Sequence, residues 1–162
     1  MIVTLPPDGI PINNFRQVNE WLYRGGQPSL EALAALKELN IKTVVSLRWR
    51  PMVMVEEEVK VNELGMQFIN IRLNYWTLPA TRHIVRFFEI IDNEENRPIF
   101  VHCFHGADRT GLCVAMYRIA RCGWTFDQAY QEMVDCGFHR FRVRHFKWIL
   151  KRMSALDFNM QS

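Results

Sequence analysis

One stretch of the sequence combines a cysteine, an arginine and a threonine at a spacing suited to phosphate chemistry. Residues 98–111 read Pro-Ile-Phe-Val-His-Cys-Phe-His-Gly-Ala-Asp-Arg-Thr-Gly. The apolar run 99–101 predicts a buried strand, and the apolar segment 112–119 predicts a buried helix. A tight loop between a strand and a helix directs backbone N–H groups at an anion. We therefore expect an anion-binding loop that begins with a cysteine.

The side chains of this stretch predict nucleophilic attack on phosphorus. Cys103 lies beside the expected helix N-terminus, which favours the thiolate over the thiol. The planar guanidinium of Arg109 can hold two phosphate oxygens, and Thr110 adds a hydroxyl beside it. Gly106 lets the backbone approach a bound anion closely.

These residues resemble the signature loop of the cysteine-dependent phosphatases, which include the protein tyrosine phosphatases and their dual-specificity relatives. The likeness consists of His102, Cys103, five further residues, Arg109 and Thr110. Outside the loop, the segments 15–16 and 23–28 (Tyr-Arg-Gly-Gly-Gln-Pro) add a less specific resemblance to small bacterial dual-specificity-like phosphatases. The motif fixes residue types and a spacing, and the expected strand and helix lie where it requires them.

The resemblance implies a role for each residue of the loop. Cys103 attacks phosphorus and forms a thiophosphate intermediate, which water then cleaves. Arg109 and the loop N–H groups stabilise the charge on the phosphoryl oxygens. Thr110 hydrogen-bonds the sulfur, and His102 orients the loop and tunes the thiolate. The substrate-binding residues are expected to be Phe104, His105, Gly106 and Ala107.

The general acid that the resemblance predicts is missing from its usual place. The family usually takes it from an aspartate about 30 residues before the cysteine, but the loop 74–79 contains no acid and Asn74 occupies that place. Asp92 lies late in a predicted helix. Asp108 lies inside the loop, in an Asp-Arg-Thr sequence that the myotubularin-like lipid phosphatases also carry. It is therefore a candidate acid or water-positioning group, or alternatively a brace for Arg109.

A basic segment near the C-terminus supplies further candidate binding residues. Residues 139–152 hold six cationic side chains and no acid: Arg140, Arg142, Arg144, Lys147, Lys151 and Arg152. Subtracting these six from the net charge of +3 leaves −3, so the excess is local and does not indicate nucleic-acid binding. Arg140 and Arg144 are candidates for contact with a polyphosphorylated substrate, and Trp76 is a candidate to cover the site. The alternatives are a solvated helix face and simple packing.

Predicted strands alternate with predicted helices along the chain. Strands are expected at 21–24, 41–47, 67–73 and 99–101, and helices at 30–39, 56–64, 81–92, 112–119, 125–136 and 143–153, with 48–51 as a loop. This order predicts an α/β fold: one phosphatase domain over 1–162, with a mostly parallel sheet of four to five strands and helices on both faces. Residues 1–12 are expected to form an N-terminal arm. The loops after residues 47, 73 and 102 should converge on one site, because ligands bind beyond the carboxyl ends of such strands.

Composition predicts the cellular compartment and the partners of this chemistry. The 162 residues contain no apolar run near the roughly 20 residues of a membrane span, so no integral membrane contact is expected. Residues 1–11 lack the basic start and apolar core of a secretory signal. The four cysteines have no paired spacing, which favours a reducing compartment, and the cytoplasm is expected. The implied reaction uses neither cofactor nor metal, and the chain is expected to be a monomer.

The substrate remains open between phosphoproteins and phosphorylated inositols. The Asp-Arg-Thr sequence and the basic segment favour an inositol polyphosphate, as in phytase-like enzymes, or a phosphoinositide. The absence of a lysine from the loop, where Ala107 stands, argues against it. A catalytically weak pseudophosphatase that binds phosphate groups is a third possibility, because the upstream acid is missing. Intact Cys103, Arg109 and Thr110 argue for turnover.

Overall fold

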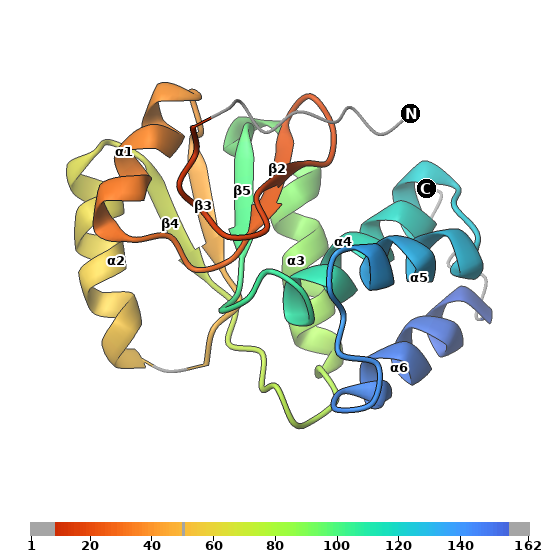
Figure 1. The fold of residues 1–162 in the computed structure, drawn as a ribbon. Coiled ribbons are helices and arrows are strands. Elements are labelled where there is room, and N and C mark those ends of the chain that lie inside the picture. The colour runs from red at the N-terminus through yellow and green to blue at the C-terminus, as the bar shows by residue number, and fades with distance from the viewer. Residues whose placement is uncertain (1–8, 50, 156–162) are drawn as a thin grey trace.

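The computed structural model describes residues 9–49 and 51–155, and contains a five-stranded sheet (Figure 1). The strand order is β1-β2-β5-β3-β4, and the strands are β1 (Arg16–Gln17), β2 (Leu22–Gly25), β3 (Thr43–Ser46), β4 (Gln67–Asn70) and β5 (Ile99–His102). Strand β1 is antiparallel to β2, and the other neighbours are parallel. The predicted mostly parallel α/β sheet is confirmed.

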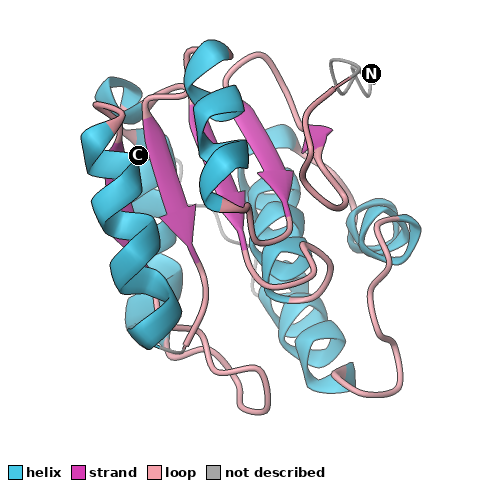
Figure 2. Cartoon of the chain, turned by 60° about the vertical axis from the view of Figure 1, so that its left-hand side comes forward, coloured by secondary structure: helices cyan, strands magenta, loops and turns pink. Residues whose placement is uncertain are grey.

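Helices cover both faces of this sheet (Figures 1 and 2). Helices α1 (Leu30–Glu38) and α2 (Pro51–Glu63) lie on one face. The other face carries α3 (Thr81–Asp92), α4 (Arg109–Cys122), α5 (Phe126–Asp135) and α6 (Arg144–Ala155), and a short 3-10 helix (Glu94–Asn96) precedes β5. The expected layer arrangement is therefore also confirmed.

Alternation along the central strands produces two hydrophobic cores. Successive side chains of a strand point to opposite faces of a sheet. Val45 and Val101 accordingly pack in the larger core with α3 to α6, whereas Val44 and Phe100 pack in the smaller core with α1. Ile12, from the end of the expected N-terminal arm, is buried in the smaller core; residues 1–8 lie outside the described residues.

Two helix starts differ from the sequence prediction. Helix α2 begins at Pro51, inside the stretch expected to be a loop, and not at residue 56. Proline suits the first position of a helix, because its missing N–H would have no intrahelical partner there. Helix α4 begins at Arg109, three residues before the expected start. The polar residues 109–111 hid this first turn from a prediction based on apolar runs.

The carboxyl ends of three strands lie side by side. Gly25 of β2 and Ser46 of β3 are both level with His102 of β5 in the sheet register. The segments that follow these strands therefore leave the sheet at one edge, as Figure 1 shows. This edge is where the predicted chemistry has to be assembled.

Candidate active site

The predicted anion-binding loop, residues 103–108, connects β5 to α4 and is called the signature loop below. Cys103 lies at its start and is buried, whereas Phe104 and His105 are exposed. Among the described residues, the backbone N–H groups of 104–108 have no intramolecular acceptor. Unpaired N–H groups at a helix N-terminus attract negative charge. The loop therefore has the features of an anion site, and binding of an anion there stays a prediction.

The fold of the signature loop depends on a glycine at its centre. Gly106 has φ +72°, in the left-handed region. A Cβ atom there would lie 2.4 Å from the backbone carbon of Gly25 and 2.5 Å from the nitrogen of Gly26. The end of β2 and the residue after it thus pack directly against the back of the loop, and only glycine permits this approach.

Three residues from the N-terminal part of the chain bind carbonyl groups of the loop from behind. The carbonyl of Gly106 accepts hydrogen bonds from Arg24 Nη2 (2.9 Å) and Asn14 Nδ2 (3.2 Å). The carbonyl of Phe104 accepts one from the backbone N–H of Gln27 (3.0 Å). These bonds occupy acceptors of the loop while its donors stay unpaired. Nothing in the local sequence around Arg24 or Asn14 predicts this role.

Arg24 is a buried cation behind the nucleophile. Its side chain is only 2% exposed, and its Nε and Nη1 have no partner among the described residues. Burial lowers the pKa of Arg24, whereas Cys136, Glu132 and Cys103 interact with its charge and oppose this shift. This guanidinium thus adds a buried positive charge close enough to interact with Cys103.

His102 is held by the carboxylate of Glu57, from helix α2. The His102 ring is fully buried, with Nε2 2.5 Å from Glu57 Oε1 and Nδ1 3.2 Å from the carbonyl oxygen of Cys103. Glu57 and the backbone of residue 103 therefore hold the ring between them and fix its orientation. Gln27 Nε2 donates to the other oxygen of Glu57 (2.9 Å). Glu57 lies in a run of three glutamates, and no local signal marks it as the one that is buried.

Arg109 and Thr110 present unpaired polar atoms at the end of the signature loop. Arg109 is 9% exposed, and its Nη1 donates to the carbonyl of Leu73 (3.3 Å). Among the described residues, Arg109 Nε and Thr110 Oγ1 are buried without a partner. Buried polar atoms are nearly always hydrogen-bonded in folded proteins. These two atoms lie beside a loop with unpaired N–H groups, and a bound phosphoryl group would supply the missing partners.

The carboxylate of Asp108 is directed at the turn between α5 and α6. Its Oδ1 accepts a hydrogen bond from the backbone N–H of His139 (2.9 Å), and its Oδ2 lies 2.8 Å from Nδ1 of the His139 ring. The Asp108 side chain is 3% exposed, and that of His139 is 41% exposed. The predicted role of Asp108 as an acid or a water-positioning group stays a prediction. Its function as an anchor for His139 is visible in the structure.

Tyr75 connects the acid-free loop 74–79 to the first turn of α6. Its carbonyl accepts a hydrogen bond from His145 Nε2 (3.1 Å), and its ring lies 5.7 Å from the guanidinium of Arg109. Burial and the nearby Asp108 carboxylate raise the pKa of Tyr75 to about 12, although Arg142 acts in the opposite direction. The side-chain oxygen of Asn74, at the place of the expected aspartate, accepts a hydrogen bond from the N–H of Trp76 (2.8 Å).

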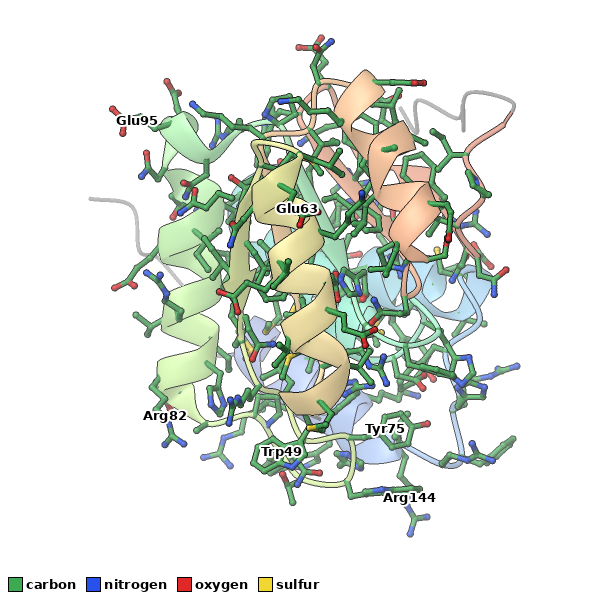
Figure 3. The ribbon with its side chains drawn as sticks, turned by 90° about the vertical axis from the view of Figure 1, so that its left-hand side faces the viewer. Trp49, Glu63, Tyr75, Arg82, Glu95 and Arg144 are labelled. Atoms are coloured by element: carbon green, nitrogen blue, oxygen red, sulfur yellow. The ribbon has the colours of Figure 1, made fainter. Side chains whose placement is uncertain are left out.

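The remaining predicted binding residues are the exposed side chains of Trp76, Arg140 and Arg144. Trp76 is 68% exposed, and its ring contacts the ring of Tyr75. The side chains of Arg140 and Arg144 are exposed and form no hydrogen bond or ion pair with the described residues. Figure 3 shows Tyr75, Trp49 and Arg144 at one edge of the molecule. The structure thus brings the basic segment to the site, while contact with a substrate stays a prediction.

Metal-binding clusters and membrane-spanning helices are both absent from the described residues. No group of three or more histidine, cysteine, aspartate or glutamate side chains within 9–49 and 51–155 is arranged to hold a metal ion. No helix in this part of the chain is both long enough and apolar enough to cross a membrane.

Comparison with protein-family models identifies the family. The model for "DSP-PTPase phosphatase fused to NAD+ Kinase" matches residues 10–148, and the chain therefore belongs to this family of phosphatase domains. The resemblance inferred from the signature loop is confirmed.

Two curated relatives and one solved structure illustrate the range of similar proteins. Dual specificity protein phosphatase TpbA of Pseudomonas aeruginosa is 28% identical over 128 residues, which are 79% of this chain and 56% of TpbA. Inositol diphosphatase DSP5 of Arabidopsis thaliana is 26% identical over 145 residues, which are 86% of this chain and 70% of DSP5. The chain thus spans little more than half the length of TpbA. The core catalytic domain of the PP-IP phosphatase SIW14 from S. cerevisiae, solved with citrate, has the same fold, with a TM-score of 0.73, 23% identity, and coverage of 91% of this chain and 94% of that one.

Proposed function

We propose that this chain is a cysteine-dependent phosphatase whose substrate is a phosphorylated inositol. The observation that carries the proposal is the convergence of unpaired donors on Cys103. The N–H groups of 104–108, Arg109 Nε and the hydroxyl of Thr110 all lack partners among the described residues. A phosphoryl group presents several oxygens that accept hydrogen bonds, and this arrangement of donors fits such a ligand.

The proposed reaction has two steps. The Cys103 thiolate attacks phosphorus, the ester oxygen leaves with a proton, and a phosphocysteine forms. Arg109 and the loop N–H groups stabilise the charge on the phosphoryl oxygens, at about 3 kcal/mol per donor. Water then attacks phosphorus, and the P–S bond breaks with Thr110 available to hydrogen-bond the departing sulfur. His102, held by Glu57, fixes the start of the loop.

The preference for an inositol phosphate rests on charge and on the relatives. The segment that begins at His139 carries cations without acids, and Asp108 joins it to the signature loop. Such a rim suits a ligand with several phosphates. DSP5 is named an inositol diphosphatase and SIW14 a PP-IP phosphatase. The name of TpbA supports the second candidate, a phosphoprotein, because it is a dual specificity protein phosphatase.

The setting proposed for this activity is a monomer in the cytoplasm. The four cysteines, all within the described residues, are free, and Cys103, Cys113 and Cys136 are buried. Free thiols, including the nucleophile, persist in a reducing compartment. No cofactor is part of the proposed reaction.

A substrate panel tests the proposal. The purified protein is assayed for phosphate release from phosphopeptides, phosphoinositides, inositol polyphosphates with and without a diphosphate group, and an activated aryl phosphate. The highest kcat/KM is expected on a phosphorylated inositol. A higher value on phosphopeptides would make the protein phosphatase the correct assignment. Binding of phosphate without turnover of even the aryl phosphate would identify a pseudophosphatase.

A further inference from the structure

The proposed reaction needs a proton donor for the leaving oxygen, and the loop 74–79 does not supply one. It contains no carboxyl group, and the side-chain oxygen of Asn74 is already hydrogen-bonded to the N–H of Trp76. Tyr75 keeps its proton far above neutral pH, because burial and the Asp108 carboxylate raise its pKa to about 12. A group with so high a pKa is poorly matched to general acid catalysis at neutral pH. The donor must come from another element.

The turn between α5 and α6 presents a suitable imidazole. Asp108 accepts two hydrogen bonds from His139, one from its backbone N–H (2.9 Å) and one from ring Nδ1 (2.8 Å). Because a carboxylate only accepts, Nδ1 carries a proton and the ring orientation is fixed. Nε2 lies on the side of the ring away from this carboxylate, and it has no partner among the described residues. A buried carboxylate that orients a half-exposed histidine is an arrangement that acid–base catalysis uses elsewhere.

The turn is attached to the signature loop at several points. Asn14 Nδ2 bonds both the carbonyl of Cys136 (2.8 Å) and that of Gly106 (3.2 Å). A Cβ atom at Gly137 would lie 3.8 Å from Cβ of Ala107. The His139 ring itself lies 5.7 Å from the ring of His105, centre to centre. His139 therefore stands at the rim formed by residues 105–108.

We infer that His139 is the general acid of the reaction proposed above, and that Asp108 is its positioning residue. As the Cys103 sulfur bonds to phosphorus, the P–O bond breaks and the proton on His139 Nε2 passes to the leaving oxygen, which departs as an alcohol. In the second step, neutral Nε2 takes a proton from the attacking water as the P–S bond breaks. Inorganic phosphate leaves, and the thiolate and the protonated ring are restored.

The inference rests on the proposed phosphatase activity and extends it to one side chain. It places the transferred proton on the ring of His139, because both oxygens of Asp108 already accept hydrogen bonds from that residue. The sequence-based alternative is direct donation by Asp108. The two assignments predict different results for substitutions of His139.

The test measures kcat/KM for a series of phosphate esters that run from activated aryl phosphates to alkyl phosphates. His139→Gln keeps a polar side chain but cannot donate a proton usefully. We expect it to lower kcat/KM on alkyl phosphates by about 10²–10⁴-fold, and on the most activated aryl phosphate only slightly. The dependence of rate on leaving-group basicity should become steeper. His145→Gln, which removes a nearby imidazole that bonds Tyr75, is the matched control and should leave this dependence unchanged.

Chemical rescue and a second substitution complete the experiment. Added imidazole should restore His139→Gly on alkyl phosphates and not on the activated ester. Asp108→Asn should steepen the leaving-group dependence less than His139→Gln does. A uniform loss across all leaving groups in His139→Gln, or full activity of this variant on alkyl phosphates, would overturn the inference. If the wild-type protein hydrolysed none of the esters, the proposed phosphatase function would fail instead.

Discussion

Cys103 and Arg109 are the residues on which the proposed chemistry depends most directly. One is a buried thiol at the start of a donor-rich loop, and the other is a buried guanidinium with a free Nε within the described part of the chain. Their roles differ, because one forms a bond to phosphorus and the other only stabilises charge. Substitutions should therefore separate turnover from binding.

Cys103→Ser should abolish turnover and leave phosphate binding largely intact. A serine hydroxyl is not ionised at neutral pH, whereas the donors of the loop remain. Arg109→Lys should lower kcat by about 10²–10³-fold, because an ammonium cannot reproduce the two-pronged contact of a guanidinium. Steady-state kinetics and calorimetric titration with inorganic phosphate measure the two effects. Substantial turnover by Cys103→Ser, or a trapped phosphate on another cysteine, would contradict the assignment.

Arg24 should limit stability while supporting activity. It is buried with two nitrogens unpaired among the described residues, and burial lowers its pKa, so its charge is costly. Replacing a poorly compensated buried ion by an apolar side chain of similar size is often neutral or stabilising. Arg24→Met should therefore keep or raise the free energy of unfolding. It should lower kcat/KM by up to about 10²-fold, because Gly106 loses a bond that positions the loop. Strong destabilisation in urea unfolding would show that the single hydrogen bond outweighs the desolvation cost.

At the scale of elements, the signature loop is supported by two other segments. The end of β2 packs against its back through Gly25 and the following Gly26. Helix α2 supplies Glu57, which fixes His102 at the end of β5. The loop conformation therefore depends on close contact between backbones as much as on its own sequence.

Gly106→Ala should lose more stability than the left-handed backbone conformation alone accounts for, because it also disrupts this backbone contact. The new Cβ would lie 2.4 Å from the backbone of Gly25, and φ is +72°. Gly123→Ala is the matched control, since φ is +69° and no atom lies within 4 Å of its Cβ. The left-handed conformation costs an L-residue about 1–2 kcal/mol in each case. We expect Gly123→Ala to lose about this much stability, and Gly106→Ala to lose more, together with phosphate binding. Equal losses of stability in the two variants would mean that the backbone of Gly25 and Gly26 shifts at little cost to accommodate the new Cβ.

At the scale of the whole molecule, charge is concentrated at the edge that carries the site. The chain outside residues 139–152 has a net charge of −3, so these six cations give one region a positive field. The fold places the start of this region beside the signature loop through the contact between His139 and Asp108. A substrate with several phosphates would be attracted to this edge.

Reversing two of these charges should discriminate between substrates. Arg140→Glu/Arg144→Glu should raise KM for an inositol polyphosphate about tenfold, which is about 1.4 kcal/mol, and change KM for an aryl phosphate much less. Lys151→Glu/Arg152→Glu makes the same change in net charge about 10 Å further along α6 and is the control. Equal effects of the first variant on both substrates would mean that the basic segment is only a solvated face. Equal effects of the two double variants on the polyphosphate would point to the overall charge of the molecule.

The sequence by itself determined the class of fold and the reactive loop. Cys103, Arg109 and Thr110 are contiguous with the strand and helix that present them, so local pattern and spacing carry the information. The alternation of strands and helices likewise follows from short-range periodicity. The start of α2 at Pro51 was missed because apolar periodicity is weak in its first turn.

Only the tertiary structure decided which distant side chains complete the site. Glu57 meets His102 across 45 positions, Asp108 meets His139 across 31, and Arg24 reaches Gly106 across 82. The residues adjacent to each of these partners in the sequence form no motif that would indicate its role. Their roles arise because packing of separate elements removes water from them and leaves each polar group to find a partner inside the protein. No local pattern of residues records which partner that will be.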